Sequence, residues 1–359
     1  MTSPLPRTSR EVRLAAVPEG LPAASDLAVA DVPLPAAGTA RLLVRNRQFL
    51  VFAALRTLIG GAVQGTPLPA LRPGATLFGP ALGEVVTAPP GSPVRPGDLV
   101  VHMLGWREYA LVPVAECTVV DPAFPDPVAL LAAGSAAYGA LTRVAPVREG
   151  DVVLVTGAAG GVGTLAGQIA RLLGASRVIG TTGTPAKAAR LTAEAGYDAV
   201  VTTESLRGGG SPGERAAAHR EFADRLAEAA PDGVDVVLDL VAGPQLGAAV
   251  DAARHGARIA LVGALSGQLA AEGGGGRAPA EIDAYRLVLL GASVRGYLGS
   301  DHPDVEAEWR TRLAGWLRSG EIRCPVTRVE GIEQAPRAFE QLMEGAYFGT
   351  VVVEQDGHG

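Results

Sequence analysis

The sequence contains very little cysteine, and this scarcity excludes several kinds of site. Its 359 residues include two cysteines, Cys117 and Cys324, which lie far apart along the chain. Two separated thiols cannot supply the four ligands of a structural zinc site, and they do not form a Cys-x-x-Cys redox pair. We therefore expect a protein of a reducing compartment, the cytoplasm.

Long apolar runs and an excess of positive charge are also missing. The sequence has no run of about 18 apolar residues and no charged start followed by an apolar core, so we expect neither secretion nor a membrane-spanning helix. The formal net charge is −6, whereas binding to nucleic acid or to an anionic membrane surface calls for a basic face. We expect neither nucleic acid nor membrane as a partner.

Lysine is the scarcest charged residue. Of the 31 basic residues, all but Lys187 are arginine. In a chain that uses arginine almost throughout, a single lysine is a candidate for a specific role. The plainer alternative is a surface lysine near the start of a helix.

The pattern of the sequence changes near residue 129. Residues from about 10 to 125 hold short apolar runs separated by proline and glycine, which is typical of strands. Further along, apolar runs alternate with helical segments, which indicates a parallel sheet covered by helices on both faces. We predict an α/β protein with a β-rich domain of residues 1–128 and 319–359 and a cofactor-binding domain of residues 129–318.

A glycine-rich turn joins a predicted buried strand, residues 151–155, to a predicted helix, residues 164–173. Such a turn binds the pyrophosphate of a dinucleotide, because N–H groups at the start of the helix point at the anion. The first glycine permits the tight turn, the second lets the backbone approach the phosphates, and the third lets helix and strand pack closely. The predicted contacts in this turn are Gly157, Gly160, Gly161, Val162 and Gly163.

The end of the second strand indicates which dinucleotide is bound. A site for NAD usually has Asp or Glu there, about 20 residues after the glycines, to hold the ribose 2′-hydroxyl. Residues 180–187 instead read Gly-Thr-Thr-Gly-Thr-Pro-Ala-Lys and contain no acid. Small hydroxyl side chains and a cation fit a 2′-phosphate. We therefore predict NADPH, bound by Thr182, Gly183 and Lys187.

Several further segments, taken with the glycine turn, resemble a known family. They are Val44-Arg45-Asn46, Leu104-Gly105-Trp106-Arg107-Glu108-Tyr109, Gly167-Gln168-Ile169-Ala170, Gly183 to Lys187, Gly196-Tyr197-Asp198-Ala199, Gly263-Ala264-Leu265-Ser266 and Phe348-Gly349. Over nearly its whole length the chain resembles the zinc-independent branch of the medium-chain dehydrogenase/reductase superfamily, which includes prostaglandin and leukotriene, alkenal double-bond and quinone reductases. The resemblance implies a GroES-like catalytic domain, a Rossmann cofactor domain, a cofactor cleft and a homodimer.

The resemblance also implies roles for single positions. Lys187 corresponds to the residue on the 2′-phosphate, and Thr203 stands where a tyrosine often contacts the same group. Segments that run along the nicotinamide correspond to Gly263, Ala264, Leu265, Tyr297 and Leu298. Hydride from NADPH would add to the β-carbon of an activated C=C bond.

The sequence departs from the family at functional positions. In place of the Gly-His-Glu of zinc-binding members it has Leu82-Gly83-Glu84, with no ligand set nearby, which predicts a site without metal. The Asp-Pro-Tyr-Met-Arg of double-bond reductases is replaced by Phe52-Ala53-Ala54-Leu55-Arg56. Asp-Asn-Val-Gly-Gly has become Asp239-Leu240-Val241-Ala242-Gly243, and a tyrosine often found after the Gly-Ala-Ile-Ser run falls at about Gln268.

Conjugate reduction needs a hydride donor, a group that polarises the carbonyl and normally a proton source. NADPH is the donor, and Arg56 is a candidate to polarise the substrate, beside backbone N–H groups and the ribose hydroxyl. The candidate proton donors are Tyr138, Tyr285, Tyr297 and Gln268, although a structural role is open for each. The apolar replacements favour a pocket for a large apolar small molecule, and its predicted lining is Phe49, Phe52, Leu55 and Tyr285.

Three functions stay open at this point. A missing acid and a large apolar pocket favour capture of the reduced substrate by an electrophile of the same molecule, which closes a ring. The chain resembles reductive cyclases that do this in polycyclic tetramate macrolactam (antibiotic) biosynthesis. Ring closure requires water to be excluded, and the glycine-rich segment 267–280 is the candidate lid. The other two functions are simple reduction of an enone, alkenal or quinone, and a non-catalytic role as an NADPH-binding sensor or structural protein.

Overall fold

A computed structural model describes residues 5–34, 40–61, 70–207 and 211–355. The chain forms two compact units. Unit 1 comprises Met1–Ala132, Leu269–Gly276 and Val326–Gly359, and unit 2 comprises Ala133–Gln268 and Arg277–Pro325. The main difference from the predicted domains is the segment Leu269–Gly276, part of the glycine-rich candidate lid, which belongs to unit 1 and not to the cofactor-binding domain.

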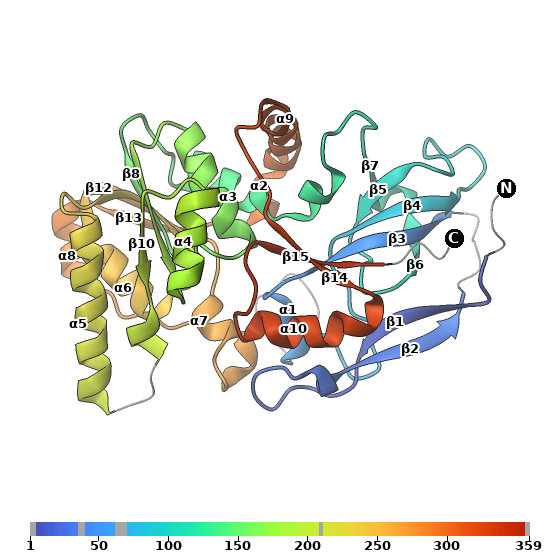
Figure 1. Cartoon of the computed structure of the whole chain (residues 1–359), viewed down its shortest axis with the longest axis horizontal. Helices are drawn as coiled ribbons and strands as arrows, with labels where there is room; N and C mark the ends of the chain where they lie inside the picture. The colour runs from blue at the N-terminus through green and yellow to red at the C-terminus, as the bar shows by residue number, and fades with distance from the viewer. Residues whose placement is uncertain (1–4, 35–39, 62–69, 208–210, 356–359) are drawn as a thin grey trace. The chain divides into compact units, whose positions relative to one another are not determined.

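Unit 1 is built on a β-sheet that joins the two ends of the chain. Along this sheet the described strands follow the order β14-β15-β3-β4-β5-β7, and β6 pairs with β3 (Figure 1). β15 pairs antiparallel with β3, so that Val351 lies opposite Val51. The strands of unit 1, including a separate antiparallel pair of β1 and β2, are β1 (Thr8–Leu14), β2 (Leu27–Pro33), β3 (Arg41–Val51), β4 (Ala81–Thr87), β5 (Leu99–His102), β6 (Tyr109–Pro113), β7 (Thr118–Val119), β14 (Val326–Glu330) and β15 (Thr350–Glu354).

Aromatic side chains form the centre of the unit 1 core. Trp106 is fully buried, and its ring centroid lies 5.2 Å from that of Phe49 and 6.2 Å from that of Phe339. Phe339 comes from helix α10 (Ala335–Met343), and Phe49 comes from β3. The core therefore requires both the N-terminal and the C-terminal parts of the chain.

The glycine-rich segment packs against the short helix α1 (Leu55–Ile59) within unit 1. The hydroxyl of Thr57 donates a hydrogen bond to the carbonyl of Gly275 at 3.2 Å. A Cβ atom on Gly60 would lie 2.1 Å from the carbonyl oxygen of Gly274, and a Cβ on Gly274 would lie 2.5 Å from that of Gly60. Two glycines are thus needed for this backbone contact, which holds the segment in place.

Unit 2 is a parallel sheet with the strand order β10-β9-β8-β11-β12-β13 in its described residues, which confirms the predicted α/β fold. All four residues of β8 are buried, as expected for a strand covered on both faces. Its strands are β8 (Val152–Val155), β9 (Arg177–Thr182), β10 (Ala199–Thr202), β11 (Val234–Asp239), β12 (Ala253–Leu261) and β13 (Ser293–Gly296).

Helices cover this sheet, and their apolar side chains pack against it to form the core of unit 2. The core includes Phe222 and Leu226 of α5, which pack with Ile179 and Val201 of the sheet. The described helices of unit 2 are α2 (Gly134–Gly139), α3 (Gly161–Leu172), α4 (Pro185–Glu194), α5 (Pro212–Ala229), α6 (Gly243–Asp251), α7 (Leu265–Gln268), α8 (Ala284–Leu290) and α9 (Pro303–Ser319). Among the described residues, none of the helices has both the length and the apolar character needed to cross a bilayer.

Candidate cofactor and catalytic site

The glycine turn lies between β8 and α3, and its backbone is fastened to the end of β9. Gly157 has φ +62°, and its N–H donates to the hydroxyl of Thr181 at 3.0 Å. The next N–H, that of Ala158, donates to the Thr181 carbonyl at 2.8 Å. The turn is therefore held by the strand that also ends at the predicted 2′-phosphate position.

Two of the three glycines have no room for a side chain, and the third faces open space. A Cβ on Gly157 would lie 2.9 Å from Cγ2 of Val241, and one on Gly163 would lie 2.5 Å from the backbone of Ala158. At Gly160 the nearest atom to such a Cβ is 3.8 Å away, and the residue is exposed. This geometry fits a pyrophosphate over Gly160 at the start of α3, where helix N–H groups bind anions.

A buried carboxylate ties the start of this turn to β11. Asp239 ends β11 and accepts a hydrogen bond from the hydroxyl of Thr156 at 2.6 Å and from the N–H of Ala242 at 2.8 Å. Thr156 Oγ1 in turn accepts from the N–H of Leu240 at 2.9 Å. Burial raises the pKa of Asp239, and these hydrogen bonds act in the opposite direction. Asp239 thus joins the end of β11 to Thr156, the residue that follows β8. This hydrogen bond fixes the distance between the two loops that begin at these strand ends.

The predicted 2′-phosphate position lies where β9 and β10 end side by side. Thr182 is the last residue of β9, and Thr184 caps α4 by accepting from the N–H of Lys187 at 3.3 Å. Lys187 therefore lies in the first turn of that helix. Thr203 differs from the expectation, because its hydroxyl donates to the Thr182 carbonyl at 3.3 Å and the residue is buried. Thr203 is therefore bonded to Thr182, and its contact with the 2′-phosphate stays a prediction.

The segments expected along the nicotinamide are brought together at neighbouring strand ends. The N–H of Gly263 donates to the carbonyl of Asp239 at 3.1 Å, and that of Tyr297 donates to Leu261 at 2.9 Å. A Cβ on Gly263 would lie 2.5 Å from the carbonyl oxygen of Leu240. These contacts place the ends of β11, β12 and β13 at one edge of the sheet, where ligands bind in open α/β folds. Ala264, Leu265 and Gln268 follow directly in α7 or just before it, and Leu298 is half exposed beside Tyr297.

Tyr138 was predicted as a proton donor, and the structure gives it a structural position. The side chain is 3% exposed, and its hydroxyl donates to the carboxylate of Glu308 on α9. Its ring packs against Trp309 and Trp316, at centroid distances of 5.9 and 6.2 Å. Burial, followed by the nearby Glu308, raises the pKa of this phenol. In this arrangement the hydroxyl joins α2 to α9, and a role of Tyr138 as proton donor stays a prediction.

Arg56 was predicted to polarise the substrate, and it too is enclosed. It is 1% exposed in unit 1, and its Nη2 donates to the carbonyl of Gly20 at 2.7 Å. Within the part of the chain that the structure describes, Nε and Nη1 make no hydrogen bond, and burial lowers the pKa of the guanidinium. The guanidinium is thus enclosed within unit 1, and a role of Arg56 in polarising a substrate stays a prediction.

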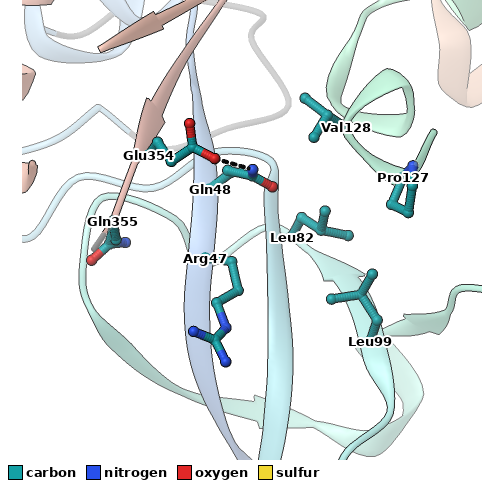
Figure 2. Close-up of a pocket in the computed structure, with 8 residues that line it drawn as sticks. All are labelled: Arg47, Gln48, Leu82, Leu99, Pro127, Val128, Glu354 and Gln355. Atoms are coloured by element: carbon teal, nitrogen blue, oxygen red, sulfur yellow. Dashed lines mark hydrogen bonds between the residues drawn. The ribbon is translucent and has the colours of Figure 1, made fainter. Parts of the chain in front are cut away.

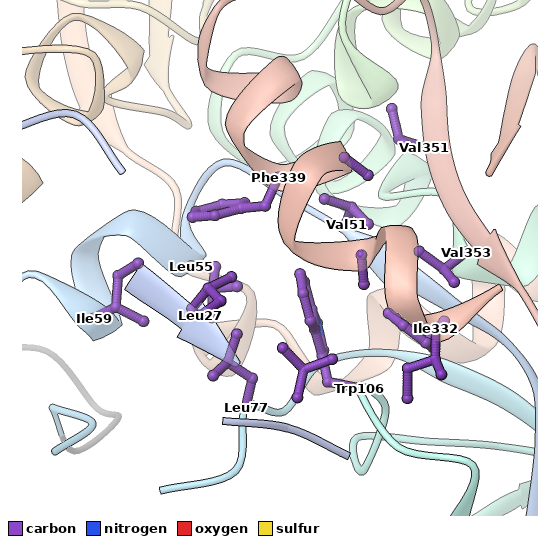
Figure 3. Packing of buried hydrophobic residues seen from close by; sticks show 14 of the residues in the cluster. Leu27, Val51, Leu55, Ile59, Leu77, Trp106, Ile332, Phe339, Val351 and Val353 are labelled. Atoms are coloured by element: carbon purple, nitrogen blue, oxygen red, sulfur yellow. The ribbon is translucent and has the colours of Figure 1, made fainter. Parts of the chain in front are cut away.

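Of the predicted lining residues of the substrate pocket, Phe49, Phe52 and Leu55 belong to unit 1 and Tyr285 belongs to unit 2. A hollow of about 410 Å³ on unit 1 is lined by other side chains (Figure 2), namely Arg47, Gln48, Leu82, Leu99, Pro127, Val128, Glu354 and Gln355. Leu55 lies inside the unit 1 core (Figure 3), as does Phe49. Tyr285 is 68% exposed on α8 of unit 2. Phe49 and Leu55 therefore contribute packing, Tyr285 lies on an open surface, and the half-buried Phe52 packs against the unit 1 core.

Sequence reasoning did not find two side-chain contacts next to the turn. Thr181 donates to Oε1 of Gln245 on α6 at 2.5 Å, and Arg225 on α5 donates to Oγ1 of Thr202 at 2.7 Å. Both contacts join residues that are far apart in sequence, so a local motif cannot predict them. Asp239 does lie in a segment that resembles a family motif, but its residue type alone does not predict a hydrogen bond from Thr156.

Ala242 is a strained residue in this site. Its φ of 65° and ψ of −154° belong to a region that is almost exclusive to glycine. We predict that Ala242→Gly raises the free energy of unfolding of the domain by about 1 kcal/mol, because relief of strain of about 1–3 kcal/mol exceeds the entropic cost of a glycine. Thermal unfolding measures this. Ala217→Gly, in the exposed part of α5, is the control and should destabilise by about 1 kcal/mol. Equal destabilisation by both changes would show that Ala242 is not strained.

Family models match both parts of the chain. The model described as "Zinc-binding dehydrogenase" matches residues 161–317, and the one described as "N-terminal domain of oxidoreductase" matches residues 10–120. Within the described ranges, no group of three or more His, Cys, Asp or Glu side chains is placed to hold a metal ion.

Named relatives give a finer assignment. Prostaglandin reductase 1 of Mus musculus is 29% identical over 293 residues, which cover 79% of this chain and 83% of that protein. A "Probable quinone oxidoreductase" of Leishmania amazonensis is 32% identical over 282 residues, which cover 76% of this chain and 78% of that protein. The fold matches that of CurA from Vibrio vulnificus, solved in complex with NADPH, with a TM-score of 0.82 and 24% identity. The match covers 97% of this chain and 99% of the CurA chain. The chain belongs to the zinc-independent branch of the medium-chain dehydrogenase/reductase superfamily.

Proposed function

We propose that the protein is an NADPH-dependent oxidoreductase that reduces an activated C=C bond of a bulky apolar small molecule. The observation that carries the cofactor assignment is the end of β9, where Thr182 and Lys187 lie without an acid in the connecting segment. A carboxylate there would repel a 2′-phosphate, whereas a lysine attracts it. The NADPH bound by CurA and the relative named for prostaglandin reduction support the assignment.

The residues of unit 2 bind and orient the cofactor. N–H groups at the start of α3 would hold the pyrophosphate above Gly160, and Lys187 would hold the 2′-phosphate. NADPH supplies the hydride when bound. Backbone groups near Gly263 and Tyr297 would orient the nicotinamide, because they lie at the edge of the sheet beyond β12 and β13. The chain thus acts mainly by positioning, which can contribute several kcal/mol to a barrier.

Ring closure coupled to reduction is the second candidate. It is favoured by the engagement of the Tyr138 hydroxyl with Glu308 and by the apolar residues Phe52, Ala53 and Ala54 where double-bond reductases have Asp-Pro-Tyr. If protonation is slow, a reduced substrate that carries its own electrophile can form a carbon–carbon bond first. Gln268, half-buried at the end of α7, remains the candidate proton donor for simple reduction.

We also propose a homodimer formed through α8 and β13 of unit 2. Val288 and Leu289 are 73% and 63% exposed, and Tyr285 lies one turn before them on the same helix. β13 is an edge strand that pairs with β12 on one side only within the described residues. Exposed apolar groups beside an open edge are typical of a surface covered by another chain. A second copy satisfies both features by twofold symmetry. We place the reaction in the cytoplasm, where the two cysteines stay reduced.

The cofactor assignment predicts that the protein binds NADPH at least about tenfold more tightly than NADH, as measured by Kd. Lys187→Ala should remove most of this preference, because the loss of a charged hydrogen bond to the 2′-phosphate costs about 1–3 kcal/mol of binding free energy. Titration with each nucleotide measures both affinities. Arg177→Ala, at the opposite end of β9, removes the same charge and should leave the preference intact. Equal affinity of the unaltered protein for the two nucleotides would overturn the assignment.

The reaction is tested with NADPH that carries deuterium at the transferable position, offered with a long-chain enone, an alkenal, a quinone and a conjugated polyene. Simple reduction predicts deuterium at the β-carbon and a solvent proton at the α-carbon. Ring closure predicts deuterium at the attacked carbon and a new ring bond instead of the solvent proton. A chelator should leave the rate unchanged, because no metal takes part. Binding of NADPH without turnover on any class would contradict an enzymatic role and favour a sensor.

The dimer proposal predicts that Leu289→Arg gives a monomer, since a charge in an apolar interface is left without a partner. Light scattering after size exclusion measures the mass. Val119→Arg, at an exposed apolar position on β7 of unit 1, is the control and should not change it. A monomeric unaltered protein at micromolar concentration would rule the interface out.

A further inference from the structure

The end of the edge strand β10 carries a side chain that no motif had indicated. Thr202 is the last residue of β10 and pairs in register with Thr182, the last residue of β9. Side chains in register on neighbouring parallel strands point to the same face and lie about 5 Å apart. A group bound next to Thr182 therefore has the side chain of Thr202 as its neighbour.

Arg225 reaches this position from α5. Phe222 and Leu226 of that helix pack with Val201, which precedes Thr202 and points to the opposite face of the strand. Arg225 lies next to Leu226, and its Nη2 donates to Oγ1 of Thr202 at 2.7 Å. Since β10 is the edge strand, the side chain can pass around the sheet edge to the face on which Thr182 and Thr202 lie.

Most of the hydrogen-bonding capacity of Arg225 remains available. The carboxylate nearest to its guanidinium is that of Glu221, at 3.8 Å from Nη1, which exceeds a hydrogen-bond distance. The bond to Thr202 is its sole hydrogen bond among the described residues, although a guanidinium carries five N–H donors. The side chain is 36% exposed, so solvent and ligands can reach it.

We propose that Arg225 is a second cation for the 2′-phosphate and thus a specificity residue for the cofactor. This inference rests on the proposed use of NADPH. Lys187 would bind the phosphate as a point charge from α4, and Arg225 would bind it from α5 through paired N–H donors. The hydroxyl of Thr203 is instead bonded to the Thr182 carbonyl in this structure. The ligand that the two cations recognise is a 2′-phosphorylated adenosine.

The experiment compares Arg225→Ala with Arg220→Ala, which removes the same charge from an exposed position of the same helix. Affinities are measured for NADPH and NADH and, without nicotinamide, for adenosine 2′,5′-bisphosphate and 5′-AMP. We expect Arg225→Ala to weaken both 2′-phosphorylated ligands about tenfold, as for a partly exposed charged hydrogen bond. NADH and 5′-AMP should change less than about twofold, and Arg220→Ala should change none of the four.

Other outcomes separate this inference from the proposed function. Equal weakening of NADPH and NADH would mean that Arg225 only fastens α5 to β10, and an unchanged NADPH affinity would also overturn the inference. If Lys187→Ala weakens NADPH and Arg225→Ala does not, the cofactor assignment stands and only this inference fails. Arg225→Gln keeps an amide donor for Thr202 and serves if the alanine variant does not fold. Arg225→Lys keeps the charge and should retain part of the preference.

Discussion

The buried carboxylate of Asp239 is the interaction on which the cofactor site depends. A carboxylate without water is stable only when its oxygens accept enough hydrogen bonds. The Thr156 hydroxyl and the N–H of Ala242 provide them, and both therefore have fixed positions relative to β11. Thr156 stands directly before Gly157, so the glycine turn begins at a point set by Asp239. Ala242, whose N–H donates to this carboxylate, adopts an unfavourable backbone conformation with φ of 65°.

The same constraint explains why the turn can bind an anion without rearranging. Thr181 fastens the first two N–H groups of the turn, and Gly163 lets α3 lie against Ala158. Tyr197 adds a hydrogen bond of 2.6 Å to the carbonyl of Gly163. The N–H groups at the start of α3 are therefore oriented before a ligand arrives, which lowers the entropic cost of binding.

Features that depend on local pattern could be predicted from the sequence. The parallel sheet, the glycine turn and the position of Lys187 in a first helical turn each follow from a short run of residues. The directions of individual side chains could not be predicted in this way. Tyr138, Arg56, Phe49 and Leu55 stand near family motifs, yet each points into a core that is completed by distant segments. A motif gives the position of a residue along the backbone, whereas the facing side is decided by tertiary packing.

The pairing of β15 with β3 has a consequence for the synthesis of the protein. The hydrogen bonds between Val51 and its partner strand cannot form until Val351, about three hundred residues later, has been synthesised. Every strand of unit 2 leaves the ribosome earlier, between these two residues. Unit 2 can therefore fold while the N-terminal strands of unit 1 remain without the partner that closes their sheet, and such contacts of long sequence separation form slowly. During this interval residues 48–51 of β3 lack their partner strand β15, and an unpaired strand edge of this kind favours aggregation.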